Sequence, residues 1–384
     1  MDVSWPHLTH EVQTIAGEWR AQRAERQARR HLDADDFARV NDAGFLHVAV
    51  PEENGGLWRS VAETTRPIAD VLRTLAAADP SVALVASMHP SVLAFWLAKP
   101  DPSREAWTQQ CEAVCATAAD GLQWGTITSE PGSGGDMLRT KSLAEPGESD
   151  GAIPGMNYRV TGDKHFGSGS GVTSFMLTTA VPAGEDAPTI FVLDVRDRPW
   201  DGSTGMRLTA EWDGAGMAAT QSHAMRLESC PATRMAWDGP VQELAAAAGP
   251  LIASVFTAVV LGVFDEAIAT AKQQLEPKMD TLRAYEQVEW ARAEMEHWLA
   301  VQAFEGGLRA VEADDRALPS ALRAKEAVAE LAESSLRRLT RVLGGGTFSR
   351  RSPFASWFED VRALGFLRPP WGLAYDTLFQ TSFG

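Results

Sequence analysis

The chain has 384 residues, 45% hydrophobic and 22% charged, which is enough for two or three structural units around a large core. Its 51 acidic residues outnumber its 35 basic residues, so the formal net charge is −16. A field of this sign repels nucleic-acid backbones and anionic membrane surfaces, and we therefore expect neither as a partner.

The three cysteines, Cys111, Cys115 and Cys230, do not form an even set that would suggest a disulfide framework. Cys111 and Cys115 lie four residues apart without a second pair of ligands, so we expect no metal site there. The N-terminal residues lack the basic and apolar segments of a secretory signal. We therefore expect a cytoplasmic protein.

Hydrophobic periodicity divides the chain into three regions. Residues 1–118 show helical spacing, as at Val12, Ile15 and Trp19. Residues 119–237 contain segments rich in β-formers, such as Thr173–Val181, separated by turn clusters. Helical patterns return in residues 238–384. The predicted fold class is therefore α+β, with an N-terminal helical domain, a middle antiparallel β-barrel or sandwich and a C-terminal helix bundle.

The C-terminal region is expected to contain three long helices, at about residues 250–275, 282–311 and 320–343. The uncharged stretch Leu244–Phe264 is long enough to cross a bilayer. Its alanines and its Gly249-Pro250 step favour the central helix of a soluble bundle instead.

Two segments of the middle region carry polar groups in a suggestive order. The first, Trp124–Asp136, alternates hydroxyls along a strand that leads into Glu-Pro and a glycine loop. Such groups can hydrogen-bond the polar edge of a flat heterocycle. In the second, Lys164–Gly171, Phe166 precedes Ser168 by two residues, so a regular strand would turn both to one face. Either segment alone could equally be a plain hairpin connection.

Four motifs in chain order resemble those of the acyl-CoA dehydrogenase family. Residues 128–136, TSEPGSGGD, resemble its Thr-Glu-Pro-Gly signature, and residues 162–168 resemble its second flavin strand. Residues 51–56 are similar to its Pro-x-x-x-Gly-Gly loop, and residues 343–346 to its late Leu-Gly-Gly. The resemblance spans most of the chain and implies a flavin-dependent oxidoreductase with FAD, whose bundle has four helices.

The resemblance also assigns roles to individual positions. Hydride would pass from an acyl-CoA to the flavin N5, and the protein would form a homodimer or homotetramer. Gly135 takes the place of a loop serine that often touches the substrate. The two glycines after the last long helix would approach the cofactor from a neighbouring subunit. The implied flavin contacts are Thr126, Thr128, Ser129, Phe166, Ser168, Gly344 and Gly345.

Acyl-CoA dehydrogenation further requires a carboxylate that removes the α-proton. The family places a glutamate in a Tyr-Glu-Gly turn or on the first bundle helix, but Gly249–Val263 contains no acid. Tyr375-Asp376 is the nearest match, so Asp376 is the candidate base, with a solvated tail residue as the alternative. Lys278 stands near the place of the family's pyrophosphate-binding arginine and is a weaker substitute.

These departures leave two other hypotheses open. The family's relatives include monooxygenases that take reduced flavin from a reductase partner, add O₂ and hydroxylate a small aromatic or amine without an α-proton base. His165 or His223 would be the histidine near the flavin in that case, although a packed or exposed histidine is the simpler interpretation. The third hypothesis is a non-catalytic flavin-binding or interaction protein.

Overall fold

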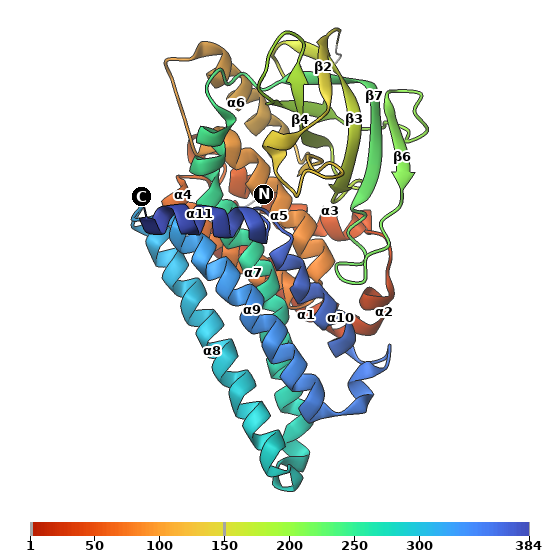
Figure 1. Cartoon of the computed structure of the whole chain (residues 1–384), viewed down its shortest axis with the longest axis vertical. Coiled ribbons are helices and arrows are strands. Elements are labelled where there is room, and N and C mark those ends of the chain that lie inside the picture. The colour runs from red at the N-terminus through yellow and green to blue at the C-terminus, as the bar shows by residue number, and fades with distance from the viewer. Residues whose placement is uncertain (1–2, 149–150, 384) are drawn as a thin grey trace.

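The computed structural model describes residues 3–148 and 151–383, and shows a barrel capped by helices above a long bundle (Figure 1). The first region is helical, as its periodicity predicts. Ser4, Ser60 and Asp79 cap three of its helices by accepting backbone N–H groups of the first turn. The helices are α1 (Trp5–Ala21), α2 (Arg23–Ala28), α3 (Ala34–Asp42), α4 (Val61–Ala76), α5 (Pro80–Leu97) and α6 (Glu105–Ala119).

The middle region forms a closed barrel. Strands β4, β2, β3, β7 and β5 pair in that order, and β5 pairs back to β4; β1 extends the sheet along β4, and β6 along β7. The strands are β1 (Trp124–Thr126), β2 (Leu143–Pro146), β3 (Asn157–Gly167), β4 (Phe175–Pro182), β5 (Thr189–Asp194), β6 (Met206–Ala210) and β7 (His223–Arg234).

The expectation of an antiparallel sheet is only partly correct. β1 and β2 both pair in parallel with β4, whereas the other pairs are antiparallel. β3 returns antiparallel to β2, and the chain then enters β4 in the direction of β2. The parallel pairing places the loop that follows β1 at one end of the barrel.

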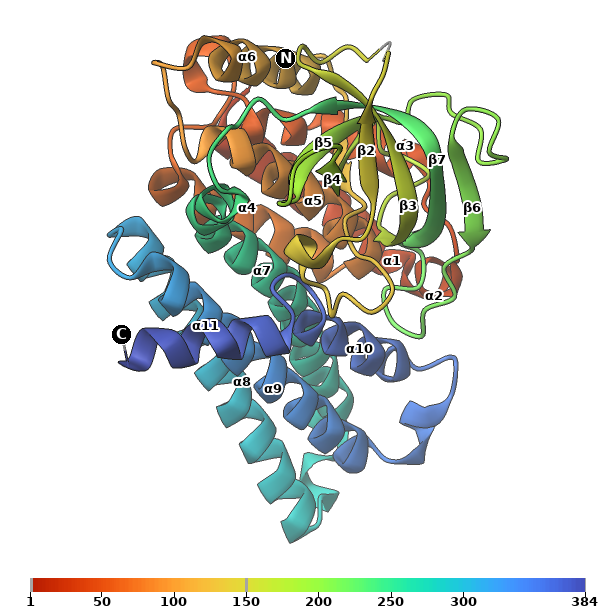
Figure 2. The same cartoon turned by 45° about the horizontal axis from the view of Figure 1, so that its top comes forward.

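The C-terminal region contributes three long helices side by side (Figures 1 and 2). The four-helix bundle implied by the resemblance is incomplete, since the last segment is divided into two short helices and α11 crosses the bundle. Pro369 and Pro370 lie between η6 and α11 and keep α10 and α11 from forming one continuous helix, because neither proline can donate a backbone hydrogen bond. The helices are α7 (Val241–Leu275), α8 (Ala284–Glu312), α9 (Ala317–Leu343), α10 (Pro353–Arg362) and α11 (Trp371–Phe383).

Short 3₁₀ turns complete the architecture. They are η1 (Phe45–Ala49), η2 (Glu52–Asn54), η3 (Met137–Arg139), η4 (Glu276–Thr281), η5 (Gly345–Phe348) and η6 (Ala363–Gly365). The sequence-based limit at residue 237 falls between β7 and α7, and the limit at residue 118 falls in the last turn of α6.

Two helices, α5 and α7, are long and apolar enough to cross a membrane by length and composition. In their most apolar windows, 94% and 78% of the residues are buried inside the protein. α7 packs against α4, α5, α8 and α9 and forms the axis of the bundle. Its apolar surface is therefore covered by protein, as expected for the core helix predicted at residues 244–264.

α4 and α7 approach each other closely at Gly262. A Cβ atom added there would lie 2.2 Å from the backbone oxygen of Arg73 and 3.0 Å from Cβ of Ala76. Near the same crossing, the Arg73 guanidinium donates to Asp265, and Nε2 of His297 on α8 lies 2.7 Å from the Asp265 carboxylate. The absence of a side chain at Gly262 thus lets α4 and α7 come close enough for Asp265 to contact both Arg73 on α4 and His297 on α8.

We expect Gly262→Ala to lower the free energy of unfolding by about 1–3 kcal/mol, because a backbone carbonyl cannot move aside as a side chain can. Gly306→Ala in α8 is the matched control, since the nearest neighbouring atom would lie 3.9 Å from the new Cβ. It should be neutral or stabilise by up to about 1 kcal/mol through helix propensity. Urea unfolding measures both, and equal effects would contradict the close packing at Gly262.

Candidate functional site

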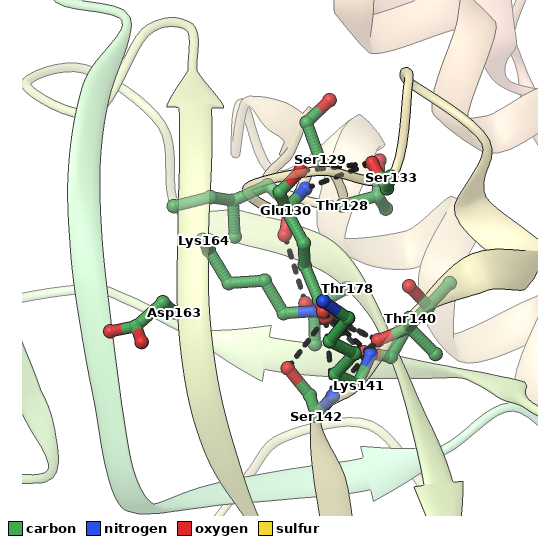
Figure 3. Close-up of polar contacts among 12 residues, drawn as sticks. Thr128, Ser129, Glu130, Ser133, Thr140, Lys141, Ser142, Asp163, Lys164 and Thr178 are labelled. Atoms are coloured by element: carbon green, nitrogen blue, oxygen red, sulfur yellow. Dashed lines mark hydrogen bonds and ion pairs between the residues drawn. The ribbon is translucent and has the colours of Figure 1, made fainter.

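A buried ion pair joins the loop after β1 to strand β3 (Figure 3). The Lys164 ammonium lies 2.5 Å from the Glu130 carboxylate and donates to the backbone oxygen of Thr179 on β4 at 2.6 Å. The two charged side chains are 0% and 4% exposed. Because an unpaired ion is costly in such surroundings, each of the two charges requires the other.

Glu130 also receives several hydrogen bonds from the segment that leads into β2. Thr140 Oγ1 and Ser142 Oγ donate to Oε1, and the backbone N–H of Lys141 donates to Oε2 at 2.6 Å. Burial alone would raise the pKa of Glu130, but the hydrogen bonds from Lys164 and these groups lower it to about 2. The carboxylate is therefore ionised at neutral pH and fully engaged.

The anchored loop lies directly against β3. The backbone N–H of His165 donates to the backbone oxygen of Ser129 at 2.8 Å, which forms an isolated β-bridge. The hydroxyls of Thr126 and Thr128 lie 3.4 Å apart on the same loop. The two polar segments that stand out in the sequence are therefore neighbours in space.

Phe166 and Ser168 do not share a face, contrary to the expectation from strand alternation. The pairing of β3 with β7 shifts register between Lys164 and Gly167, and Phe166 adopts a left-handed backbone with φ of 57°. This conformation interrupts the two-residue period. Phe166 is 56% exposed, whereas Ser168 is buried and its hydroxyl lies 2.8 Å from the hydroxyl of Ser222.

Phe166 is accessible to a ligand on its exposed face and contacts aromatic rings on the protein side. Its ring centroid lies 6.0 Å from that of Trp212, edge to face, and 6.1 Å from that of His165. His223 is buried, and its Nδ1 accepts the backbone N–H of Trp212 at 2.9 Å. Burial lowers the pKa of His223. His223 is thus a packed residue that supports Trp212, while His165 borders Phe166.

Arg368 completes the hydroxyl cluster, and the sequence analysis did not identify it. It lies between η6 and α11, and its Nη2 donates to Thr128 Oγ1 and to Ser129 Oγ, the latter at 3.1 Å. Its Nη1 donates to the backbone oxygen of Gly135 at 3.1 Å. Burial lowers the pKa of Arg368 to about 10, although the charge of Asp136 opposes the shift. The guanidinium is therefore a cation at neutral pH.

Gly135, the expected substrate contact, lies under the same C-terminal loop. Its φ is 80°, and a Cβ added there would lie 2.8 Å from Cγ of Pro370. Asp376, the candidate base, lies on the exposed face of α11 and makes no hydrogen bond or ion pair within the described residues. The charged group at Thr128 and Ser129 is thus Arg368, and the placement of Asp376 gives no support to its role as a base there.

Gly344 and Gly345 lie apart from these residues. They follow α9 at the end of the bundle that is remote from the barrel (Figure 1). Gly344 has a φ of 85°, and a Cβ at either glycine would meet no atom within 4 Å. Within one chain they cannot contact a ligand at Ser129, so their implied role stays a prediction that needs a second subunit.

A separate polar cavity of about 460 Å³ opens between α2, the start of α5, the β6–β7 connection and α10. Asp360 borders it, and burial raises the pKa of this carboxyl group to about 7 although the backbone N–H of Met217 donates to it at 2.7 Å. Arg26, also at the cavity, is buried between Asp36 and Asp79. The other arginines that line the cavity are Arg29, Arg30, Arg350 and Arg351.

The residues present can accommodate a flat, polar heterocycle at the barrel end. Phe166 offers an exposed aromatic face next to His165, whose backbone N–H bonds to Ser129. Thr126 at the end of β1 and Thr128 and Ser129 in the anchored loop supply hydroxyls. Within residues 3–148 and 151–383, no group of three metal-ligating side chains is brought together.

No family model matches this chain, and no curated protein matches it in sequence. It is similar in structure to TdsC, a dibenzothiophene monooxygenase from Paenibacillus sp. A11-2, in its FMN-bound form. The TM-score is 0.78 at 18% identity, over 97% of this chain and 96% of TdsC.

Two other solved structures are similarly close. KijD3, in complex with FMN and dTDP-3-amino-2,3,6-trideoxy-4-keto-3-methyl-D-glucose, gives a TM-score of 0.81 at 22% identity, over 99% of this chain and 94% of that one. The methanesulfinate monooxygenase MsuC from Pseudomonas fluorescens gives 0.74 at 18% identity, over 97% and 96%. These TM-scores establish the acyl-CoA dehydrogenase-like fold. Because the sequence identities are low, function has to be argued from the site.

Lys164→Met should lower the free energy of unfolding by about 3–5 kcal/mol, because it leaves the Glu130 charge buried without its partner. The Glu130→Met, Lys164→Met double variant should recover most of this loss. Arg226→Ala is the matched control, since Arg226 pairs at 2.7 Å with exposed Asp163, which points away from the barrel interior (Figure 3). Its effect should stay below about 1 kcal/mol. Comparable losses in Lys164→Met and Arg226→Ala, measured by urea unfolding, would contradict this account.

Acid should remove part of the stability that Glu130 provides. The pKa is about 2 in the folded chain and 4.5 for the unperturbed group, so this contribution is complete above pH 4.5 and disappears as pH falls towards 2. Between pH 5 and 2 the wild type should therefore lose roughly 3 kcal/mol more than Glu130→Gln, and Asp163→Asn should follow the wild type. Parallel curves for wild type and Glu130→Gln would show that the carboxylate is not depressed.

Proposed function

We propose that this chain is a flavin-dependent monooxygenase that receives reduced flavin from a separate flavin reductase and uses O₂ to oxidise a small molecule. Two proteins of the same fold, TdsC and MsuC, are named as monooxygenases, and TdsC and KijD3 bind FMN. We therefore propose FMN as the flavin, with FAD, the cofactor implied by the family resemblance, as the alternative. When bound, the reduced flavin would supply the electrons that activate O₂.

One observation favours this function over acyl-CoA oxidation. Removal of an α-proton requires a free carboxylate beside the flavin, and the charged group that contacts Thr128 and Ser129 is the cationic Arg368. The buried carboxylate of this loop, Glu130, is already engaged by Lys164 and four further donors. A guanidinium cannot act as a general base at neutral pH. Oxygenation of a substrate has no need of such a base.

The Ser129 hydroxyl can donate to a ligand. Arg368 donates to the hydroxyl oxygen of Ser129, so the Ser129 hydrogen is free for an acceptor on a ligand. A flavin presents such acceptors along its pyrimidine edge, and Phe166 would cover its ring. Thr126 and Thr128 would extend this edge contact. Ser168, whose hydroxyl is paired with Ser222, would contribute through its backbone.

We further propose a homo-oligomer acting in the cytoplasm. Gly344 and Gly345 directly follow α9, whose C-terminal end lies away from the barrel (Figure 1), and this is compatible with a role at a neighbouring subunit. α8 also exposes a stripe of apolar side chains, including Val288 (50%), Met295 (54%) and Leu299 (40%). Spacings of seven and four residues place these three on one face of the helix.

The function can be tested with purified chain, FMN or FAD, NADH, a general flavin reductase and ¹⁸O₂. Small aromatic compounds, amines and organosulfur compounds form the panel, and mass spectrometry detects ¹⁸O in the products. We expect incorporation for at least one compound class and a rate loss of at least tenfold in Phe166→Ala. Leu143→Ala, at an exposed apolar residue of β2, is the control.

A second arm separates the alternatives. The flavin-loaded chain is mixed with acyl-CoAs of several lengths without oxygen, and flavin absorbance is followed. Bleaching would support acyl-CoA dehydrogenation and contradict the proposal. A chain that binds neither flavin, or that binds one without reaction in either arm, would support the non-catalytic hypothesis.

A further inference from the structure

Arg368 carries a charge that the protein does not neutralise locally. Its three protein hydrogen bonds go to two neutral hydroxyls and one backbone oxygen, and no carboxylate of the described residues lies within 4.0 Å of it. Its Nε–H and one Nη1–H donate to no described residue. Arg368 is half-buried, and a cation withdrawn from water to this extent is ordinarily paired with a carboxylate, since its desolvation is costly.

The surrounding charges increase this imbalance. Lys164 is close enough for the charge of Arg368 to lower its pKa, after the larger effect of burial. The negative charge of Glu130 is balanced by the positive charge of Lys164, and its oxygens already accept hydrogen bonds from the anchored loop. Glu130 therefore does not neutralise Arg368 as well. Asp136 acts on Arg368 only beyond ion-pair distance, and its carboxylate accepts the backbone N–H of Leu138 at 2.9 Å. A chain with a net charge of −16 thus keeps a cationic site at this end of the barrel.

We propose that Arg368 is the binding site for an anionic group of the substrate, so that the substrate class is an organic oxyanion such as a carboxylate, sulfinate or phosphate ester. This inference rests on the proposed function, in which the flavin ring occupies the space beside Phe166 and Ser129. Arg368 connects that edge to Gly135, whose loop is covered by Pro370. An anion held there by charge-assisted hydrogen bonds would lie next to the ring and be fixed in orientation.

The proposal commits to the substrate as the source of the anion. The flavin is the competing source, because its phosphate is anionic in both oxidation states and its reduced ring is also anionic at neutral pH. The two sources differ in what the loss of Arg368 weakens: the binding of a substrate anion, whether or not flavin is bound, or the binding of the flavin itself.

Calorimetric titration of the full-length chain tests the proposal, with and without bound oxidised FMN. The probes are benzoate, methanesulfinate and inorganic phosphate, with benzamide as the neutral analogue of benzoate. We expect at least one anion to bind saturably and Arg368→Gln to raise its Kd by tenfold or more. Arg368→Lys should retain part of the affinity, and benzamide binding should not change. Arg362→Gln, which removes an exposed arginine paired with Glu359 at 2.7 Å, is the control and should leave every Kd unchanged.

The proposal is overturned if no anion of the panel binds, or if Arg368→Gln binds the anions as the wild type does. It is also overturned if the variant loses affinity for FMN, oxidised or reduced, while its binding of benzoate and methanesulfinate is unchanged, which would assign the cation to the cofactor. Circular dichroism verifies that each variant is folded. If the chain binds no flavin at all, the proposed function fails, and the titration of the flavin-free chain still decides the role of Arg368.

Discussion

The contact between Lys164 and Glu130 determines where the polar groups of this molecule stand. Neither charge can reach water, so the loop after β1 is bound to β3 and, through the backbone oxygen of Thr179, to β4. The hydroxyls of Thr128 and Ser129 are carried by this loop and therefore hold fixed positions at the barrel end. Preorganised donors of this kind need no rearrangement when a ligand arrives, which is the main physical requirement for orienting a cofactor.

The charge brought to these hydroxyls decides which chemistry the fold can perform. The C-terminal loop delivers a guanidinium, whereas acyl-CoA oxidation would require a carboxylate. A cation beside a flavin edge stabilises negative charge on the ring or on a bound substrate, and it cannot remove a proton. Under the proposed function, the loop between α10 and α11 therefore favours oxygenation over acyl-CoA oxidation.

Sequence periodicity predicts the order of helices, barrel and bundle, and the family resemblance marks the segments around Ser129 and Phe166 as flavin contacts. The errors occur where local pattern carries no information. A left-handed backbone at Phe166 breaks the alternation that put it on one face with Ser168. Residues 363–370 show no hydrophobic periodicity that would predict their course, so the sequence does not point to Arg368. Asp376 is predicted because Tyr-Asp resembles Tyr-Glu; α11 begins at Trp371 and exposes this aspartate, and its role as a base stays a prediction.

A crystal structure of the chain soaked with FMN tests the proposed flavin site most directly. We predict the isoalloxazine ring at the barrel end, with Phe166 at its face and the Ser129 hydroxyl within hydrogen-bonding distance of its pyrimidine edge. A ring seated instead in the arginine-lined cavity beside α2 and α10, or the absence of bound flavin at saturating FMN, would contradict it.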